Sequence, residues 1–358
     1  MRIQIVACFC LIITHVSTLL YAQEGKDTLT LRVVSYNVEN LFDYKHDTLK
    51  NDYEFLPDAI RHWNYSKYKK KLDNLARTII AIGEWNPPAL VALCEVENDR
   101  VMRDLTQYSA LRETGYRYIM THSPDERGID VALLYQRGMF KPLSHQSISV
   151  PKPSPQNRPT RDILHVCGIL PNLDTLDLFI AHFPSRAEGA KKTEDYRISA
   201  ANRLRKAADS ICHKRSYPQI IIMGDFNDYP SDRSVREILQ AQLPPASNDS
   251  LHAKHLYHLL ARKAQQKKSF WQYNTYGSYK FQGEWGLLDH ILVSGNLLHS
   301  NSTFYTCEEK AGIFAPSFLL IIDKKYGGKQ PFRTYHGMKY QGGYSDHLPV
   351  YADFQLIY

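Results

Sequence analysis

The sequence predicts a layered α/β fold in one domain, and two patterns indicate it. Eight short apolar runs have the composition of buried β-strands, and two longer segments repeat apolar residues with the period of an amphipathic helix. Strands mixed with helices along one chain are typical of sheets that are covered by helical layers. Of the 358 residues, 43% are hydrophobic and 23% are charged, which is a globular composition and excludes a disordered or fibrous chain.

The predicted strands are spread over the whole chain, so both halves contribute to the sheets. They cover residues 31–36, 90–94, 130–135, 163–169, 176–181, 220–223, 290–293 and 347–354. The proline-rich stretch 151–159 interrupts this series and is interpreted as a surface loop within the domain. No segment has the composition of a long flexible linker, and we therefore expect residues 23–358 to form a single domain.

The two predicted helices each present one apolar face, as helices that cover a core do. The first begins near Ser66 and stops at Gly83, and its apolar face carries Leu72, Leu75, Ala76 and Ile79. The second carries Ile198, Ala201, Leu204, Ala208 and Ile211. The run Lys69, Lys70 and Lys71 in the first helix is interpreted as a solvated face.

The first 22 residues differ from the rest and resemble a cleaved secretory signal. Arg2 is followed by an apolar run, and Ala22 precedes a polar stretch. A membrane anchor is the alternative, but polar residues interrupt the run, whereas a spanning helix requires ~20 mainly apolar residues. We therefore predict export to the periplasm or the medium, without a stable membrane anchor. Removal of this segment takes away one positive charge, Arg2, and changes the formal net charge from +7 to +6.

Cysteine usage argues against a zinc–thiolate site. Six cysteines are present, of which Cys8 and Cys10 lie in the predicted signal. The remaining four have no Cys-x-x-Cys spacing: Cys94, Cys167, Cys212 and Cys307. One disulfide is compatible with an oxidising compartment, but the sequence does not assign a pair. The modest basic excess suits either an anionic substrate or simple solubility.

Polar side chains follow four of the predicted strands at the point where each strand ends. These residues are Asn37, Glu95, His182 and Asp225. Glu39 and Asn227 lie two residues beyond the first and the last of them. For a single position, a turn residue after a strand is the simpler interpretation. Because the pattern repeats at several strand ends, we instead expect a common site.

Two further strands have the reverse order, since polar residues open them. Asp289 opens the run 290–293, and Asp346 and His347 open the last strand. A strand that runs opposite to its neighbours begins at the edge where they end, so a mixed sheet brings all these positions to one rim. Clustered carboxylates repel one another unless a cation neutralises them. Oxygen ligands of this kind suit a hard cation such as Mg²⁺, with Mn²⁺ or Ca²⁺ as alternatives.

The motifs around these residues resemble the endonuclease/exonuclease/phosphatase superfamily, which includes deoxyribonuclease I, abasic-site endonucleases, sphingomyelinases and inositol-phosphate phosphatases. They occur in the order Ser35-Tyr-Asn-Val-Glu-Asn, Leu93-Cys-Glu-Val-Glu-Asn, Ala181-His-Phe-Pro-Ser-Arg, Met223-Gly-Asp-Phe-Asn-Asp, Leu288-Asp-His-Ile-Leu-Val and Tyr344-Ser-Asp-His-Leu-Pro-Val. The resemblance implies a four-layer α/β sandwich with two central mixed β-sheets flanked by helices. It is specific for the superfamily and weak for the substrate.

The resemblance also implies which residues lie on the metal side of the site. Glu95 resembles the principal metal ligand, and Asn37 organises both the metal and the phosphate. Glu39 is expected to join through water or at a second metal. Asp346 resembles a metal-side carboxylate.

The remaining residues of the resemblance carry the acid–base chemistry. Asp225 resembles the residue that orients or deprotonates the attacking water, and Asn227 and His182 resemble donors to that water and to phosphate oxygens. His347 resembles the histidine that contacts the phosphate or acts as the base. Asp289 would hold the ring of His347, because a carboxylate partner fixes the imidazole tautomer and raises its pKa.

Two arginines are further candidates for binding the substrate. Arg161 precedes a predicted strand, and Arg186 closely follows His182. The planar guanidinium group suits phosphate oxygens, although a surface ion pair is an equally good interpretation of each residue.

Together these features predict an exported, Mg²⁺-dependent phosphoesterase, expected as a monomer, that hydrolyses phosphodiester bonds in the manner of a nuclease. The alternative is a lipid- or inositol-phosphate-directed enzyme of the same superfamily. A catalytically silent binding protein on this fold is the alternative of another class. Nuclease action predicts salt-dependent binding in a basic groove. A lipid enzyme predicts exposed apolar loops near the metal.

Overall fold

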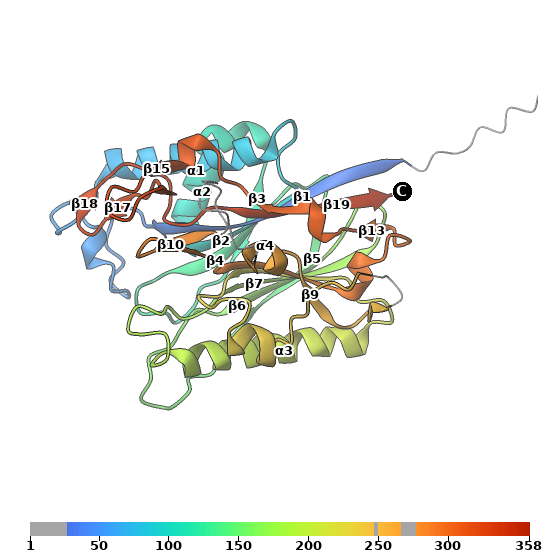
Figure 1. Cartoon of the computed structure of the whole chain (residues 1–358). Coiled ribbons are helices and arrows are strands. Elements are labelled where there is room, and N and C mark those ends of the chain that lie inside the picture. Colours follow the sequence, from blue (N-terminus) through green and yellow to red (C-terminus); the bar gives the residue numbers. More distant parts are fainter. Residues whose placement is uncertain (1–26, 247–249, 266–276) are drawn as a thin grey trace, which may run out of the picture.

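Two β-sheets lie face to face at the centre of the molecule, and helices cover their outer faces (Figure 1). The structure is a computed structural model and describes residues 27–246, 250–265 and 277–358. The arrangement confirms the predicted four-layer α/β sandwich. The predicted signal segment lies outside the described residues.

The first sheet joins the two ends of the described chain. Its order is β13 (Phe304–Tyr305), β19 (Val350–Ile357), β1 (Thr28–Leu41), β2 (Leu90–Val96), β4 (Asp130–Tyr135) and β3 (Arg117–Met120), and β14 (Ala311–Ile313) also pairs with β19. β1 runs parallel to β2 and antiparallel to β19, so this sheet is mixed.

The second sheet is mixed as well. Its order is β5 (Lys141–Ile148), β6 (Ile163–Ile169), β7 (Thr175–His182), β8 (Ile220–Asp225), β12 (Asp289–Ser294) and β9 (Leu256–His258). β7 and β8 are parallel, and β12 runs antiparallel to β8. Because the two strand directions meet at one edge, residues at the end of β8 lie beside residues at the start of β12.

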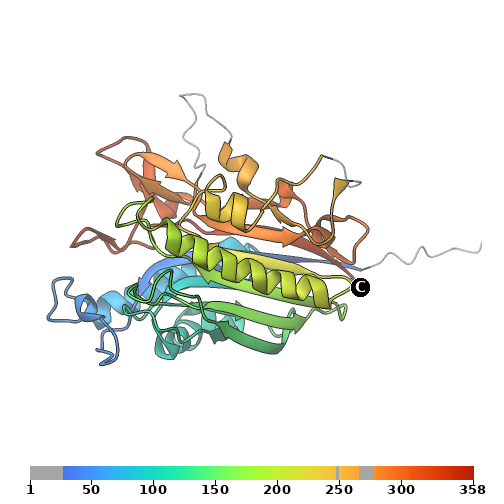
Figure 2. The same cartoon turned by 90° about the horizontal axis from the view of Figure 1, so that it is seen from below.

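Helices close both outer faces of the sandwich. α1 (Tyr65–Gly83) and α2 (Asp99–Gln107) pack on the first sheet, and α3 (Glu194–Lys214) packs on the second. Figure 2 shows α3 running along the outer face of its sheet. The short helix α4 covers Ala261–Gln265. Single helical turns also occur at Tyr53–Phe55, Ala110–Thr114, Ser234–Ile238, Gly295–Leu298, Glu308–Lys310 and Ser317–Leu319.

Three two-stranded hairpins lie outside the main sheets. They are β10 (Tyr279–Phe281) with β11 (Glu284–Gly286), β15 (Leu320–Ile322) with β16 (Lys329–Pro331), and β17 (Tyr335–His336) with β18 (Lys339–Tyr340). They gather at the left end of the molecule in Figure 1. This is the end at which β1 finishes and β19 begins, so the hairpins surround the rim where the sequence places the candidate residues.

Local sequence explains the boundaries of α1. The Asn64 side chain accepts a hydrogen bond from the Lys67 amide and caps the first turn. The helix ends at Gly83, as predicted, where a Cβ atom would lie 2.8 Å from the ring of Pro88. In α3, the predicted apolar face is only partly confirmed, because Ala201, Leu204 and Ala208 are buried while Ile198 and Ile211 are half-buried.

Several sequence-based boundaries differ from the structure. The last strand begins at Val350, not at His347, because Pro349 has no amide hydrogen for the ladder and His347 is held by contacts of its own. β3 and β5 were not predicted, since β3 is an edge strand of only four residues and β5 is an edge strand rich in polar side chains. Cys94, Cys167, Cys212 and Cys307 are free thiols among the described residues. No helix in the described ranges is long and apolar enough to span a membrane.

Two buried histidines connect β9 and β12. His258 Nδ1 accepts the Leu260 amide hydrogen, so its proton lies on Nε2, which is 2.7 Å from His290 Nδ1. The remaining N–H of His290 donates to the Asp228 carbonyl at 2.9 Å. This series of hydrogen bonds requires both imidazole rings to be neutral. It fixes the loop that follows β8.

This histidine pair predicts a loss of stability at acidic pH. Burial lowers the pKa of His290 to about 4 and holds that of His258 well below its ordinary value. The unfolded chain therefore binds more protons below pH ~6.5, and His290 alone should contribute roughly 3 kcal/mol that is lost as the pH falls to ~4. Urea unfolding measured across this range should show a steeper decline for the wild type than for His258→Gln/His290→Gln. Exposed His213→Gln is the control, and equal slopes for all three proteins would contradict the assignment.

Candidate active site

The strand register brings three predicted residues side by side at the rim of the second sheet. His182 is paired with Asp225 between β7 and β8, and Asp225 is paired with Asp289 between β8 and β12. Close approach of the strands requires a glycine before Asp225, since a Cβ atom on Gly224 would lie 1.9 Å from the Ala181 carbonyl oxygen. An imidazole and two carboxylates therefore meet at one edge.

Asn37 connects this rim to the first sheet. It lies in β1, and its Nδ2 group donates to Glu95 Oε1 at 3.2 Å and to Asp225 Oδ2 at 2.9 Å. Its Oδ1 atom accepts the Glu39 amide hydrogen. The amide thus contacts the predicted metal ligand through nitrogen, and it bridges the two layers of the sandwich.

Glu95 occupies a bulge at the end of β2. The register shifts between Cys94 and Val96, and Glu95 has a φ of +69°, a conformation that is rare for residues other than glycine. Its Oε2 atom accepts the Asn40 amide hydrogen at 2.8 Å. The strained backbone turns this carboxylate toward Asn37 and His182, whose Nε2 lies 3.9 Å away.

His347 lies between two carboxylates. Its Nδ1 is 2.7 Å from Asp289 Oδ2, and its Nε2 is 3.7 Å from Asp225 Oδ2. Burial opposes a charge on the ring, but the two carboxylates outweigh it and raise the pKa of His347 well above its ordinary value. The ring of Tyr279 packs against it at 4.8 Å. This arrangement favours the protonated form of the imidazole.

Asp225 is suited to accept a proton, whereas His347 is suited to donate one. Burial raises its pKa to about 7, although His347 and the hydrogen bond from Asn37 act against that rise. Asn227 holds the carboxylate in place, because its backbone N–H donates to Oδ1 at 2.8 Å and its side chain donates to Oδ2 at 3.3 Å. A carboxylate with a pKa near neutrality is suited to accept a proton.

His182 is the uncharged histidine of the rim. Its Nε2 lies 3.7 Å from Asp225 Oδ2. Burial, together with the positive charges of Arg161 and Arg127, lowers its pKa well below the ordinary value. A neutral ring can donate one hydrogen bond to a substrate oxygen without repelling a nearby cation.

Asp346 lies on the segment before β19 and pairs with Arg333 at 2.8 Å. Sequence reasoning missed Arg333, because nothing in its local pattern distinguishes it from the other basic residues of the C-terminal region. The Arg333 guanidinium also approaches Glu39 at 3.7 Å. One cation thus stands between two of the carboxylates that were predicted on the metal side.

Glu39 faces away from Glu95. Its two oxygens accept the backbone N–H groups of Thr334 and Tyr335 at 2.6 and 3.2 Å, and Lys71 Nζ lies 4.0 Å away. Lys71 also donates to the Tyr344 carbonyl. Lys71 is therefore buried, which corrects its interpretation as part of a solvated helix face. The Lys71–Glu39 pair fastens the β17–β18 hairpin to the rim.

Removal of this buried cation should destabilise the protein. Lys71→Met leaves the Glu39 carboxylate with less compensation in a buried environment, and we expect the free energy of unfolding to fall by about 3 kcal/mol. Urea denaturation measures the change, with exposed Lys70→Met as the matched control on the same helix. The double variant Lys71→Met/Glu39→Gln should recover part of the loss. A change below about 1 kcal/mol, typical of a surface ion pair, would contradict this description.

The two candidate arginines do not contact the rim carboxylates. Arg161 is buried and binds Asp125 at 3.2 Å and the Phe183 carbonyl at 2.8 Å. Arg186 pairs with Asp232 at 3.1 Å and packs on a tyrosine ring. Arg161 is nevertheless close to Asn227, because both side chains donate to the Phe183 carbonyl oxygen, Asn227 at 3.0 Å.

The donor set fits a hard cation at the mouth of the site. Asp225, Asp289 and His347 offer atoms within 4.8 Å of one another, but these atoms already form a hydrogen-bonded network around the imidazole. Glu95 and Asp346 are more open to a cation, because their side chains are 16% and 19% exposed whereas those of Asp225 and Asp289 are fully enclosed. Asp346 Oδ2 is bound by Arg333, so a cation there would have to compete with the guanidinium. Partly hydrated carboxylate oxygens are what Mg²⁺ prefers.

A family model described as the endonuclease/exonuclease/phosphatase family matches residues 32–355 of the chain. Comparison with curated proteins found no match. The matched range contains all of the rim residues described above.

Solved structures with the same fold include proteins of different activities. A mannosyl-6-phosphatase of Bacteroides thetaiotaomicron is 16% identical, with a TM-score of 0.54, and the match covers 90% of this chain and 99% of that one. TDP2 of D. rerio, complexed with a single-strand DNA product, is 16% identical, with a TM-score of 0.51 and coverage of 91% and 98%. The human Nocturnin catalytic domain with a bound sulfate anion is 15% identical, with a TM-score of 0.50 and coverage of 92% and 97%. At these identities the likeness concerns the fold alone.

Proposed function

Because this chain belongs to the endonuclease/exonuclease/phosphatase family, we propose that it is an exported phosphodiesterase that cleaves phosphodiester bonds with Mg²⁺ and an activated water. Membership of the family makes the protein a metal-dependent phosphoric ester hydrolase. The nuclease-like action, the choice of Mg²⁺ and the export are the parts that we propose. Export is supported by the pattern of residues 1–22 alone.

One constellation carries the proposal. The protonated His347, the proton acceptor Asp225 and the metal-side carboxylate Glu95 are joined through Asn37 within one rim. A silent binding protein would have no use for this arrangement, since enclosing several carboxylates around one imidazole costs stability unless a ligand or a reaction requires it.

The side chains divide the work of hydrolysis among them. Asp225 accepts the proton of the attacking water as the oxygen–phosphorus bond forms. His347 donates its Nε2 proton to the oxygen of the breaking ester bond, and Asp289 keeps the ring oriented for that transfer. His182 donates a hydrogen bond to a phosphoryl oxygen. A cation held by Glu95 and Asp346 would offset the negative charge that grows on the phosphoryl oxygens.

A lipid- or inositol-directed phosphoesterase is the second candidate, and one observation favours it. The hairpins beside the rim expose large apolar side chains, since Phe281 is 59% exposed and Ile322 is 72% exposed. Lys280 links the two hairpins, because its Nζ group binds Asp323 at 2.8 Å. Lys324, Lys325 and Lys329 are exposed on the β15–β16 hairpin, and exposed apolar residues among such lysines suit an interface with anionic lipid.

A substrate panel on the purified mature chain, residues 23–358, tests the proposal. We expect Mg²⁺-dependent cleavage of single-stranded DNA or RNA and of bis(4-nitrophenyl) phosphate, complete loss with chelator, and recovery with Mg²⁺, Mn²⁺ or Ca²⁺. Sphingomyelin and phosphoinositide vesicles form the second arm. Cleavage confined to the vesicles would transfer the assignment to the second candidate. Hydrolysis that survives chelation would contradict both.

A further inference from the structure

A pocket of about 420 Å³ opens beside the catalytic rim. It lies between the connections β3–β4, β5–β6 and β7–α3. Four cationic side chains line it: Arg127, Arg158, Arg161 and Lys192. Three acids, Asp125, Glu126 and Glu188, also line it, so the walls carry an excess of positive charge.

The pocket adjoins the active site. The Phe183 carbonyl oxygen accepts hydrogen bonds from Arg161 on the pocket side and from Asn227 on the catalytic side. Arg127 bonds to Asn40, whose backbone amide in turn holds Glu95. A substrate bound at the rim therefore has this pocket as its immediate neighbour.

The acidic side chains of the pocket do not neutralise all of its basic side chains. Asp125 is paired with Arg161, and Glu188 is shared between Arg158 and Lys192, each at 3.1 Å. The side chain of Arg158 is 70% exposed and that of Lys192 is 72% exposed, so both can turn from Glu188 toward a ligand. The Arg127 guanidinium donates to the uncharged amide of Asn40.

The buried wall of the pocket also contains polar atoms without a partner. Thr160 Oγ1 and Arg161 Nε make no hydrogen bond within the described part of the chain, although both residues are more than nine-tenths buried. Buried donors are nearly always satisfied in folded proteins, and such exceptions point to a missing acceptor. Both atoms have almost no accessible surface, so an anion in the pocket would reach them only if the segment around Thr160 shifts.

We propose that the pocket binds a second phosphate of the substrate, so that the enzyme prefers esters carrying another phosphate next to the one it hydrolyses. This inference rests on the proposed function and adds a substrate class to it. Arginine forks match phosphate oxygens in geometry and remain charged at every physiological pH. The second phosphate belongs either to a nucleic-acid strand or to an inositol phosphate.

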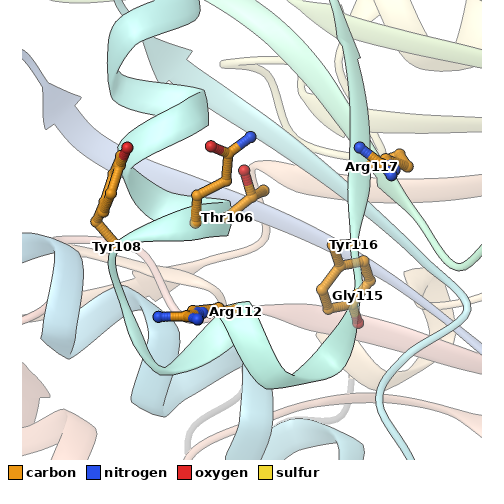
Figure 3. Close-up of a pocket in the computed structure, with 7 residues that line it drawn as sticks. Thr106, Tyr108, Arg112, Gly115, Tyr116 and Arg117 are labelled. Atoms are coloured by element: carbon orange, nitrogen blue, oxygen red, sulfur yellow. The ribbon is translucent and has the colours of Figure 1, made fainter.

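A different hollow provides the control. A pocket of about 530 Å³ lies by α2 and β3, with Tyr108 and Arg112 on one side and Arg117 on the other (Figure 3). Arg117 is paired with Tyr135, whereas the rim is at the opposite end of the same sheet, near Asp130. The variant Arg112→Ala/Arg117→Ala thus removes two arginines from a pocket that does not adjoin the site.

Calorimetric titration in chelator, without turnover, tests the pocket directly. The wild type should bind 5′-phosphorylated dithymidylate at least tenfold more tightly than unphosphorylated dithymidylate, or inositol 4,5-bisphosphate at least tenfold more tightly than inositol 4-phosphate. The arm that shows the preference identifies the source of the phosphate. Arg158→Ala/Lys192→Ala should abolish the preference, whereas Arg112→Ala/Arg117→Ala should retain it.

Turnover with Mg²⁺ separates this inference from the proposed function. Arg158→Ala/Lys192→Ala should raise KM about tenfold for the preferred substrate and leave kcat, and the hydrolysis of bis(4-nitrophenyl) phosphate, unchanged. No preference in either binding arm, with hydrolysis intact, would overturn the pocket and leave the function standing. A binding preference without hydrolysis of any ester would support the pocket and overturn the function.

Discussion

Replacement of His347 by alanine is expected to lower kcat by roughly 10²- to 10⁴-fold, the contribution typical of a positioned proton donor. Within the described ranges, no other cationic group contacts both Asp225 and Asp289, so we expect no neighbouring side chain of the rim to take over the proton transfer of His347. Steady-state kinetics on a phosphodiester and single-turnover rates measure the loss. KM should change little, because the proton is transferred in the transition state.

Two further variants separate chemistry from folding. Asp289→Asn keeps the shape of the Asp289 side chain but removes the charge that sustains the protonated imidazole, and its kcat should fall between those of the wild type and His347→Ala. His347→Gln preserves much of the volume and should be as inactive as the alanine variant. Near-normal turnover in a folded His347→Gln protein would contradict the assignment of His347 as the proton donor.

Replacement of Glu95 by glutamine should reduce both turnover and metal binding. The amide retains an oxygen for the Asn40 N–H group but loses the negative charge that holds a cation, so we expect kcat to fall at least a hundredfold. Titration of Mn²⁺ monitored by calorimetry should show an affinity at least tenfold weaker. Both readouts are needed, since a loss of turnover alone would also follow from a misplaced His182.

Glu97 offers a matched control for this substitution. It lies two residues further along the chain, accepts the Asp43 amide hydrogen at 2.6 Å, and is buried. Burial raises its pKa to about 8, so glutamine closely imitates its neutral form. Glu97→Gln should leave kcat and Mn²⁺ affinity unchanged. Equal losses of kcat and Mn²⁺ affinity in Glu95→Gln and Glu97→Gln would show that any substitution in this turn has the effect, and that Glu95 is not a specific metal ligand.

The central strands of the fold could be predicted because their apolar runs are buried on both faces. β2, β4 and β8 coincide with predicted runs to within two residues. The edge strands β3 and β5 could not, since β3 has only four residues and the polar side chains of β5 reach solvent.

The residues of the candidate site likewise fall into those that the sequence could predict and those that it could not. Residues at the ends of apolar strands, such as Asp225 and His347, were recognisable because a polar group there has a defined place on the rim. Glu39 satisfies the same local pattern, yet its carboxylate serves the backbone of the β17–β18 hairpin. Lys71 and Arg333 become significant only when that hairpin folds over α1. Local pattern therefore identifies the chemical groups but not the long-range contacts that hold them.

The Asn37–Asp225 hydrogen bond has a consequence for how the protein fails under stress. It spans the seam between the two sheets, because Asn37 lies in β1 and Asp225 ends β8. A slip of one sheet past the other by a fraction of an ångström lengthens this bond before it disrupts the apolar core that the two sheets share. Catalysis should therefore be lost under pressure or mild denaturant while spectroscopic signatures of folded structure persist. The turnover rate would then report how well the two sheets are aligned.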